Sequence, residues 1–322
     1  MQRNRVARQR AFGMLAAALP GAALAAGWAV WGGTLTSGHL AGQSAPSISY
    51  SAGPIHAVSV GCPGTGDISQ AVDRARQYVY QEFEACDDGN GIGLARSANG
   101  GKSYTRPVAL PGSDGGWDPW LAVAPDGVLY AAFMDTLGNQ TYPVIDVSHD
   151  HGRTFRAEYS LRPAHGTNWG DAEYLAVGPN GTLYVAWDYG PSDPEISFST
   201  DGGREWSAPA QATPDRKNVP HITEVAGAGP GKAYVAWLSS SDPRGYALYL
   251  RAFSISASRD GRWLSAAVRI SRKFGNPDDF PGDTFGIATS SPAALAVSWG
   301  SAVPGSRGNA SVSAVPITVL TR

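Results

Sequence analysis

The sequence predicts an all-β fold of repeated antiparallel sheets, and a β-propeller of four-stranded blades is the arrangement we favour. Three observations support this. The 322 residues include 40 Gly, 23 Pro, ten Trp and thirteen Tyr, and charged residues make up only 16%. That composition is typical of many short strands joined by tight turns. A hairpin unit and a separate Asp-containing turn also recur along the chain, in phase with one another.

The hairpin unit is clearest in two segments, 121–133 and 175–187, which read LAVAPDGVLYAAF and LAVGPNGTLYVAW. Each segment places Asp-Gly or Asn-Gly between two runs of alternating apolar residues. This is the strongest short-range signal for a hairpin, because both central positions of the turn tolerate positive φ. Looser copies span residues 225–237 and 287–299. The repeats therefore contribute at least two adjacent strands each.

A second unit follows each hairpin: a Ser, an Asp or Asn two residues later, then Gly and a closing aromatic residue. The acid positions of this turn are spaced by 51, 51 and 59 residues, and they are Asn99, Asp150, Asp201 and Asp260. An Asp side chain in such a turn accepts hydrogen bonds from backbone N–H groups of the turn, and Gly supplies a permissive backbone. We therefore predict that these four residues fasten turns at the outer rim and have no part in chemistry.

Each repeat has room for four strands, so each aromatic residue at the end of a second strand indicates one blade. These residues are Phe83, Phe133, Trp187, Trp237 and Trp299. Five blades are favoured, and six are the alternative because residues 46–77 show no clear strand pattern. The first repeat retains only its second strand, and helical periodicity is greatest over Ile68–Gln77. A strand at Ile48–Tyr50 would complete the last sheet and remove an exposed edge. The closing aromatics of the turns are expected to pack between neighbouring sheets.

Residues 1–45 are predicted to be an export signal or an N-terminal anchor plus a linker, and residues 46–322 a single propeller domain. Four Arg in the first ten residues precede an apolar run over residues 11–33. A cleaved signal and a secreted or periplasmic protein are favoured. A membrane tether through residues 11–33 is the alternative, because the run approaches the ~20 residues that a span needs. Cys62 and Cys86 are expected to form a disulfide, with two buried free thiols as the alternative.

The charge balance limits the class of partner. Without the first 45 residues, 21 basic and 27 acidic residues remain, a formal net charge of −6. A mildly acidic domain without Gly-rich phosphate loops argues against nucleic acid as a ligand. No cofactor and no metal ion are expected, and a cation bridged by acids is the lesser alternative.

The turn pattern Ser-x-Asp-x-Gly-x-Thr-aromatic resembles the Asp-box, or bacterial neuraminidase repeat, of the sialidase superfamily. The resemblance covers about Tyr78 to the C-terminus and implies a β-propeller. Enzymes and non-catalytic binding proteins both carry such repeats, so a carbohydrate or protein ligand is implied. The superfamily's sialidases resemble one another in an Arg cluster, a Tyr nucleophile and an Arg-Ile-Pro motif. That motif is absent here, and no Arg stands at the start of an inner strand, so we rank a binding protein above a sialidase.

The first residues of the inner strands of a propeller surround one mouth of its channel, which is the default binding site. Aromatic faces stack on sugar rings, and carboxylates bind hydroxyls or transfer protons. The predicted ligand-binding residues at these positions are Trp117, Trp120, Trp169, Asp171, Glu173, His221 and Phe285. If the protein is a glycoside hydrolase instead, Asp118 and Asp283 are the predicted catalytic pair. The alternative is that the acids cap the strands and the Trp side chains fill the core.

Overall fold

The computed structural model describes residues 54–62, 67–86, 91–160, 170–189, 193–212, 220–242, 245–256, 258–271, 285–302 and 310–319. All of them belong to one compact unit, residues 52–322. The predicted signal or anchor and the segment Ile48–Tyr50 lie outside the described residues. The described residues contain strands and turns but no helix, which confirms the all-β prediction. Accordingly, none of them forms a helix with the length and apolar character of a membrane span.

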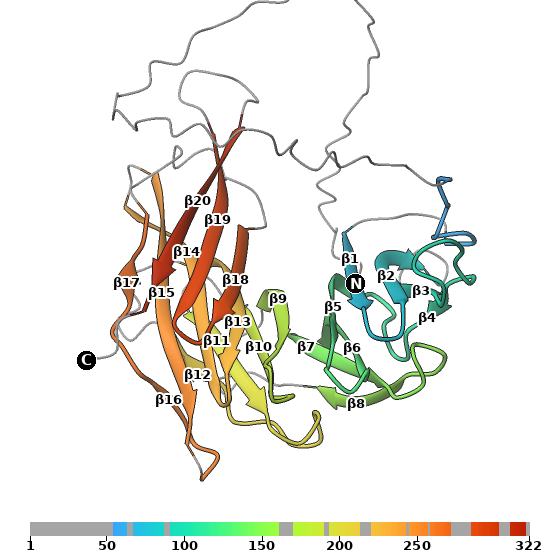
Figure 1. Ribbon diagram of the computed structural model, residues 1–322, viewed down its shortest axis with the longest axis horizontal. Coiled ribbons are helices and arrows are strands. Elements are labelled where there is room, and N and C mark those ends of the chain that lie inside the picture. The colour runs from blue at the N-terminus through green and yellow to red at the C-terminus, as the bar shows by residue number, and fades with distance from the viewer. Residues whose placement is uncertain are drawn as a thin grey trace, which may run out of the picture. The chain divides into compact units, whose positions relative to one another are not determined.

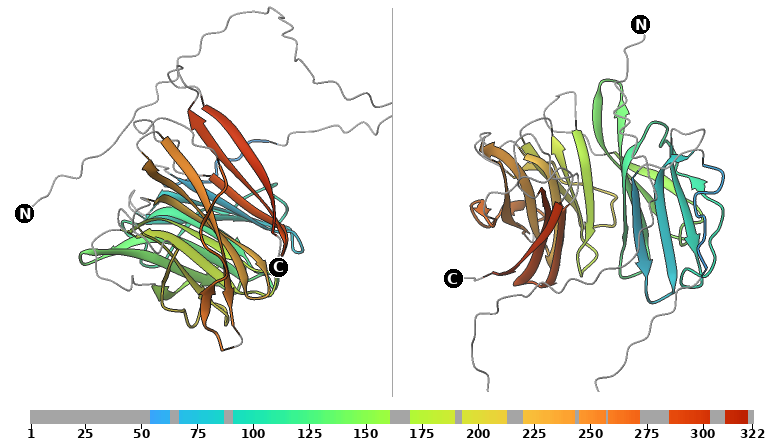
Figure 2. Two further views of the ribbon diagram at one scale, coloured as in Figure 1. Left: turned by 90° about the vertical axis from the view of Figure 1, so that its left-hand side faces the viewer. Right: turned by 90° about the horizontal axis from the view of Figure 1, so that it is seen from above.

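The described strands form five antiparallel sheets that follow one another in chain order (Figure 1; Figure 2). The strands of the first and second sheets are β1 (Ile68–Asp73), β2 (Tyr78–Cys86), β3 (Gly91–Ser97), β4 (Val108–Ala109), β5 (Trp117–Val123), β6 (Leu129–Leu137), β7 (Gln140–Ser148) and β8 (Arg156–Ser160). Those of the third sheet are β9 (Gly170–Val177), β10 (Leu183–Tyr189), β11 (Asp193–Ser199) and β12 (Ala210–Gln211). Those of the fourth and fifth sheets are β13 (Pro220–Gly229), β14 (Lys232–Asp242), β15 (Gly245–Ile255), β16 (Gly261–Trp263), β17 (Val268–Arg269), β18 (Phe285–Ser291), β19 (Ala294–Ala302) and β20 (Ala310–Thr318).

Sequence neighbours are also sheet neighbours, as in the blades of a propeller. The strand orders are β1-β2-β3-β4, β5-β6-β7-β8, β12-β11-β10-β9, β13-β14-β15-β16 with β17 on β15, and β18-β19-β20. The first strands of successive sheets touch: β1 contacts β5, β5 contacts β9, β9 contacts β13 and β13 contacts β18. These are therefore the inner strands that the sequence analysis expects.

Apolar side chains fill the space between facing sheets. Between the first and second sheets, Tyr80 and Leu94 pack against Phe133. Trp187 fills the interface of the second and third sheets, and Trp237 that of the third and fourth. The alternation of each strand thus sends one set of side chains to the preceding sheet and the other to the following one.

The strand β1 corrects one expectation. The helical periodicity over Ile68–Gln77 is misleading, and the first repeat has its inner strand after all. β1 pairs with β2 along its whole length, and Asp73 closes the hairpin by accepting hydrogen bonds from the backbone and guanidinium of Arg76 (3.1 and 2.9 Å). The periodicity fails because Ile68 and Val72, which form the apolar stripe of a helix, are 72% and 46% exposed.

The repeated Asp-containing turns join the third and fourth strands of the first four sheets. The carboxylate of Asp150 accepts hydrogen bonds from the Ser148 hydroxyl (2.9 Å) and from the N–H groups of Arg153 (3.0 Å) and Thr154 (2.9 Å). Related networks surround the other three positions, Asn99, Asp201 and Asp260. Each of these side chains therefore acts inside its own turn.

The closing aromatic residues of the second and third turns pack toward the preceding sheet. Phe155 contacts the core between the first and second sheets, and Trp206 contacts the core between the second and third. Tyr104 packs with Phe83 on the opposite face of the first sheet. In all three repeats the closing aromatic residue of the turn thus joins an apolar cluster that also contains hairpin residues.

The two cysteines flank the first strand pair. Cys62 precedes β1, and Cys86 is the last residue of β2. No described cysteine is free. The side chain of Cys86 lies outside the described side chains, so the pairing of the two cysteines stays a prediction.

Candidate functional site

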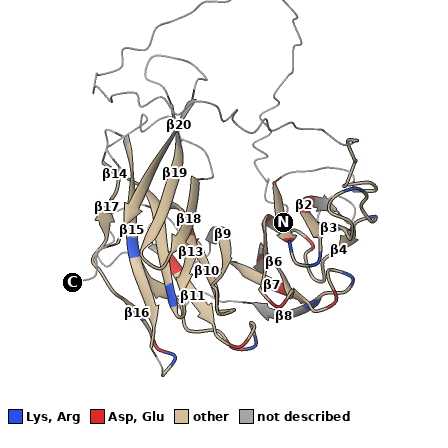
Figure 3. Cartoon of the chain, viewed as in Figure 1, with Lys and Arg blue, Asp and Glu red and all other residues tan. Residues whose placement is uncertain are grey.

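Each sheet has two chemically different ends. At one end the inner strands begin and their partner strands finish, as the pairing of Trp117 with Met134 and of Asp171 with Asp188 shows. We call this the strand-start end. The other end, the turn end, holds the turns between the first and second strands and the Asp-containing turns. Figure 3 shows that charged residues of the described part lie both in the turns and within the strands.

Asp118 lies in a β-bulge at the start of β5. The register between β5 and β6 shifts between Trp117 and Trp120, and Asp118 has a φ of 52°. Non-glycine residues rarely adopt this left-handed conformation. The N–H of Asp118 donates to Oε1 of Glu84 at 2.9 Å. Bulges are common beside functional sites because they change the direction of a side chain. The bulge therefore makes Asp118 a candidate site residue.

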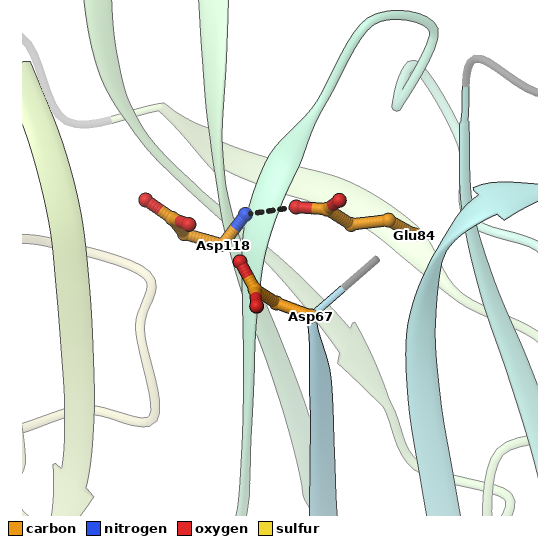
Figure 4. Close-up of side chains that lie close together, drawn as sticks. All are labelled: Asp67, Glu84 and Asp118. Atoms are coloured by element: carbon orange, nitrogen blue, oxygen red, sulfur yellow. Dashed lines mark hydrogen bonds between the residues drawn. The ribbon is translucent and has the colours of Figure 1, made fainter. Parts of the chain in front are cut away.

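Asp118 shares a carboxylate cluster with Asp67 and Glu84 from the first sheet (Figure 4). Each of the three offers an oxygen within 4.8 Å of the others. Asp67 is exposed, and the other two are half-buried. Burial raises the pKa of Glu84 and the charge of Asp67 adds to this, while the N–H groups of Asp118 and Asp67 oppose it. The cluster therefore combines a carboxyl group of raised pKa, Glu84, with an exposed carboxylate, Asp67.

We assign no metal ion to this cluster. The three oxygens are close enough to surround a cation, but a carboxylate oxygen of Glu84 already binds the backbone of Asp118. Among the described residues, no other Asp, Glu, His or Cys joins the group. A hard cation such as Ca²⁺ takes six to eight oxygen ligands, which these side chains do not supply.

Two further acids at the strand-start end connect neighbouring sheets. Glu224 on β13 accepts hydrogen bonds from the N–H groups of Phe285 (3.2 Å) and Ile287 (3.0 Å) on β18. Asp188 on β10 accepts one from the hydroxyl of Thr223 on β13. Burial raises the pKa of Glu224 to about 8 even though the two N–H donors oppose it. Both acids therefore hold sheets together from buried positions.

The hydroxyl of Tyr174 on β9 is the point where these acids converge. Burial raises its pKa well above the usual value, and the charges of four acids from three sheets add to the effect. They are Glu224, Asp118, Asp188 and Glu173. Tyr174 itself is only 5% exposed. Four carboxyl groups from three sheets therefore act on one buried phenol at the strand-start end.

Trp120 supports this arrangement from the second sheet. Its ring packs edge-on against Tyr174, with 4.5 Å between ring centroids, and its indole N–H donates to the carbonyl of Leu175 at 2.8 Å. The indole N–H is thus used inside the protein. Trp117, the first residue of β5, is half-buried beside Asp118.

The predicted site residues fall into three groups. Trp117, Asp118, Trp120 and Glu173 are brought together at the strand-start end, although Glu173 is only 2% exposed. Phe285 begins β18 and packs against the core between the fourth and fifth sheets. Trp169 and Asp283 lie outside the described residues, and so do the side chains of Asp171 on β9 and His221 on β13.

The sequence analysis did not assign Asp67, Glu84, Asp188, Glu224 or Tyr174 to the site. A signal for two of them exists in the repeat. Glu84 and Asp188 each directly follow the aromatic residue of the second strand, Phe83 and Trp187. Comparing the position after the aromatic across repeats therefore finds acids that comparing strand starts misses.

A cavity of about 630 Å³ lies at the turn end, between the second and third sheets. Its wall includes Asp126, His149, Asp201 and Arg204. Asp201 is held by its own turn, and Asp126 accepts the N–H of Val128 (3.1 Å). None of the predicted ligand-binding residues lines this cavity.

Comparison with solved structures decides the fold. A protein of unknown function from Dyadobacter fermentans superposes with a TM-score of 0.55 at 14% identity, covering 80% of this chain and 77% of that chain. An α-L-arabinofuranosidase from Fusarium graminearum, in complex with an iminosugar inhibitor, gives 0.51 at 12% identity over 80% and 93%. An α-L-arabinanase from Penicillium chrysogenum, in complex with arabinobiose, gives 0.51 at 16% identity over 80% and 81%.

This chain has the β-propeller fold. The two enzymes are glycoside hydrolases built on that fold. At these identities the likeness extends to the fold alone. The sequence matches no protein-family model, and it matches no curated protein.

Proposed function

We propose that this protein binds a carbohydrate at the strand-start end, around the carboxylate cluster of Asp67, Glu84 and Asp118. The observation that carries the proposal is the bulge that turns Asp118 into a left-handed conformation beside two other carboxylates. Sugar hydroxyls donate hydrogen bonds to such oxygens, and the half-buried ring of Trp117 offers an apolar face next to them. A carbohydrate ligand is favoured over a protein because the similar arabinofuranosidase and arabinanase are in complex with an iminosugar and with arabinobiose.

Binding is favoured over catalysis because the buried acids are already engaged. Glu224 and Asp188 hold neighbouring sheets, and Glu84 holds the backbone of Asp118. A general acid or base must be able to reach the substrate's proton, which such contacts hinder.

The test is calorimetric titration of the purified domain with arabinobiose and a panel of other oligosaccharides. Asp118→Asn is expected to lower the affinity at least tenfold, about 1.4 kcal/mol, because a charged acceptor becomes a neutral one. The matched control is Asp126→Asn, an exposed carboxylate at the turn end of the same sheet, which leaves the affinity unchanged. Equal affinity in the wild type and Asp118→Asn removes the proposed site.

Glycoside hydrolysis is the second candidate, and the raised pKa of Glu84 favours it. A carboxyl group that stays protonated beside an ionised one is the arrangement that glycosidases use. Glu84 is then the proton donor and Asp118 its ionised partner. A screen with fluorogenic glycosides, including an arabinofuranoside and a sialoside, tests this. Glu84→Gln and Asp118→Asn each lower kcat at least 100-fold, whereas the exposed control Glu205→Gln does not. Turnover that neither change affects excludes this assignment.

We further propose that the protein is exported and that Cys62 and Cys86 form a disulfide after export. The basic head and the apolar run over residues 11–33 support export. N-terminal sequencing of the mature protein separates a cleaved signal from a retained anchor. Mass spectrometry of unreduced peptides tests the disulfide, because free thiols at both positions contradict it.

A further inference from the structure

Glu82 and Asp146 are two acids that break the repeat. Glu82 directly precedes the aromatic residue of its second strand, and the next three sheets have Ala132, Ala186 and Ala236 at that position. Asp146 stands two residues before the Ser of its Asp-containing turn, where the first and third repeats have Ala95 and Ser197. A feature shared by the repeats serves the fold, so these two departures need a separate explanation.

Both acids point into the same interface, between the first and second sheets. Glu82 lies opposite Leu94, and Asp146 lies opposite Ala131. Directly opposed residues of antiparallel strands share a face, and Leu94 and Ala131 belong to the apolar core of this interface. Both acids are 0% exposed. None of their four carboxyl oxygens has a hydrogen-bond partner.

Among the described residues, no basic group lowers the pKa of either acid. Burial and then the charge of Asp146 raise the pKa of Glu82, and burial raises the pKa of Asp146 to about 7. The other charged groups on the surrounding strands cause neither shift. They are Asp67, which precedes β1, Asp73 on β1, Glu84 on β2, Arg96 on β3, Asp118 on β5, Asp135 on β6 and Arg156 on β8. The pair is therefore electrostatically isolated.

Two ionised carboxylates without donors are not stable in an apolar interior. Two carboxyl groups that share one site keep a proton between them, because each negative charge disfavours the other. We propose that Glu82 and Asp146 share one proton and so form a pH-sensitive latch between the first and second sheets. The carboxylic O–H of one residue then donates to the carboxylate of the other. Loss of that proton to solvent leaves two like charges facing each other.

The latch acts on the strand that supports the carboxylate cluster. Glu84 lies two residues beyond Glu82 on β2, where the register with β3 shifts after Phe83, and it accepts the N–H of Asp118. Weakening this interface at alkaline pH therefore loosens the support of Asp118. The inference stands whether or not the strand-start end binds a carbohydrate.

The sign of the pH dependence follows from the direction of both shifts. The folded chain keeps protons that the unfolded chain loses near the ordinary values of 3.8 and 4.5. Stability is therefore greatest below those values and decreases as the pH rises through about 7. Each proton that only the folded state retains raises the unfolding constant about tenfold per pH unit.

The experiment is urea unfolding of the full chain, followed by Trp fluorescence between pH 5 and pH 9. The wild type is compared with the double variant Glu82→Gln/Asp146→Asn, which has no titrating group at the pair. We expect the ratio of the two unfolding constants, wild type over double variant, to rise at least tenfold from pH 6 to pH 8. The exposed control Asp126→Asn follows the wild type. Parallel curves for the wild type and the double variant overturn the proposal.

Two further measurements keep the test decisive. The infrared carbonyl band of a protonated carboxyl group is expected in the wild type at pH 7 and is expected to be weaker in the double variant. If the double variant does not fold, Glu82→Ala, which restores the residue of the other repeats, replaces it. If the pair shares a proton, addition of Na⁺, Ca²⁺ or a chelator to the wild type at pH 8 leaves its free energy of unfolding unchanged. Cation-dependent stability that the variant lacks points to a bound cation and overturns the proposal.

Discussion

The acids at the two ends of the sheets have opposite chemistry. At the turn end, partial burial of Asp150 disfavours its charge, yet the hydrogen bonds from Thr154, Ser148 and Arg153 outweigh it and lower its pKa to about 2. Asp201 behaves in the same way. At the strand-start end, burial raises the pKa of Glu84 and of Glu224.

The difference lies in where the hydrogen-bond donors come from. A turn acid receives all its donors from within five residues, so its network is complete wherever the motif occurs. A strand-start acid depends on the neighbouring sheet, which supplies one or two N–H or hydroxyl donors and partly or fully buries the carboxyl group. The turn acids are therefore satisfied within their own turns, while the strand-start acids connect sheets and have raised pKa values at Glu84 and Glu224. The repeated Asp-containing turn therefore indicates the fold, and the acids at the strand-start end indicate the candidate site.

The largest expected effect is the loss of a connection between sheets. Glu224→Ala leaves the N–H groups of Phe285 and Ile287 without an acceptor, and we expect it to lower the free energy of unfolding by about 3 kcal/mol. Glu224→Gln retains one acceptor oxygen and is expected to lose about half as much. Denaturant unfolding at pH 7 measures both.

The matched control for that change is Glu205→Ala, an exposed acid in a turn of the third sheet. Its effect is expected to stay within 0.5 kcal/mol, as for most surface substitutions. A loss for Glu224→Ala as small as that of the control contradicts the connecting role of strand-start acids.

A smaller effect is expected at the turn end. Asp150→Ala removes an acceptor that serves two backbone N–H groups and two hydroxyls, and we expect a loss of roughly 2 kcal/mol. Asp150→Asn is expected to recover about half, because Asn99 fills the same position in the first repeat. The stabilisation by Asp150 is present above the ordinary pKa of 3.8 and is lost as the pH falls through about 2.

The carbohydrate affinity of the same Asp150 variant also distinguishes the turn end from the strand-start end. Asp150→Ala leaves the affinity for a carbohydrate ligand unchanged if the turn acids only fasten turns. An affinity loss with preserved folding contradicts the distinction between the ends.

Most of the fold can be predicted because its signals are local. The hairpins at 121–133 and 175–187 and the turn around Asp150 combine turn chemistry and alternation within about fifteen residues. β1 could not be predicted, because Ile68 and Val72 are exposed and give the strand no alternating apolar face. The apolar pattern shows burial only where a neighbouring sheet covers the strand.

The site could be predicted only in part. Asp118 and Trp117 stand at a strand start, which the repeat reveals. Glu84 and Glu224 become significant only through contacts 34 and 61 residues away, to Asp118 and Phe285. Such contacts depend on how sheets pack. The position of Glu84 after Phe83, which Asp188 shares after Trp187, indicates an acid but does not reveal which backbone group that acid contacts.

The smallest expected effect is also the sharpest test of the strand-start end. Asp118 holds a φ of 52°, which costs a non-glycine residue more than glycine. Asp118→Gly is therefore expected to stabilise the protein by about 0.5 to 1 kcal/mol while the carbohydrate affinity falls at least tenfold. Asp118→Ala, which keeps the strain and also loses the carboxylate, is the control and is expected to lower both quantities. If Asp118→Gly destabilises the fold, the bulge is a packing requirement, and Asp118 has the same structural role as the turn acids.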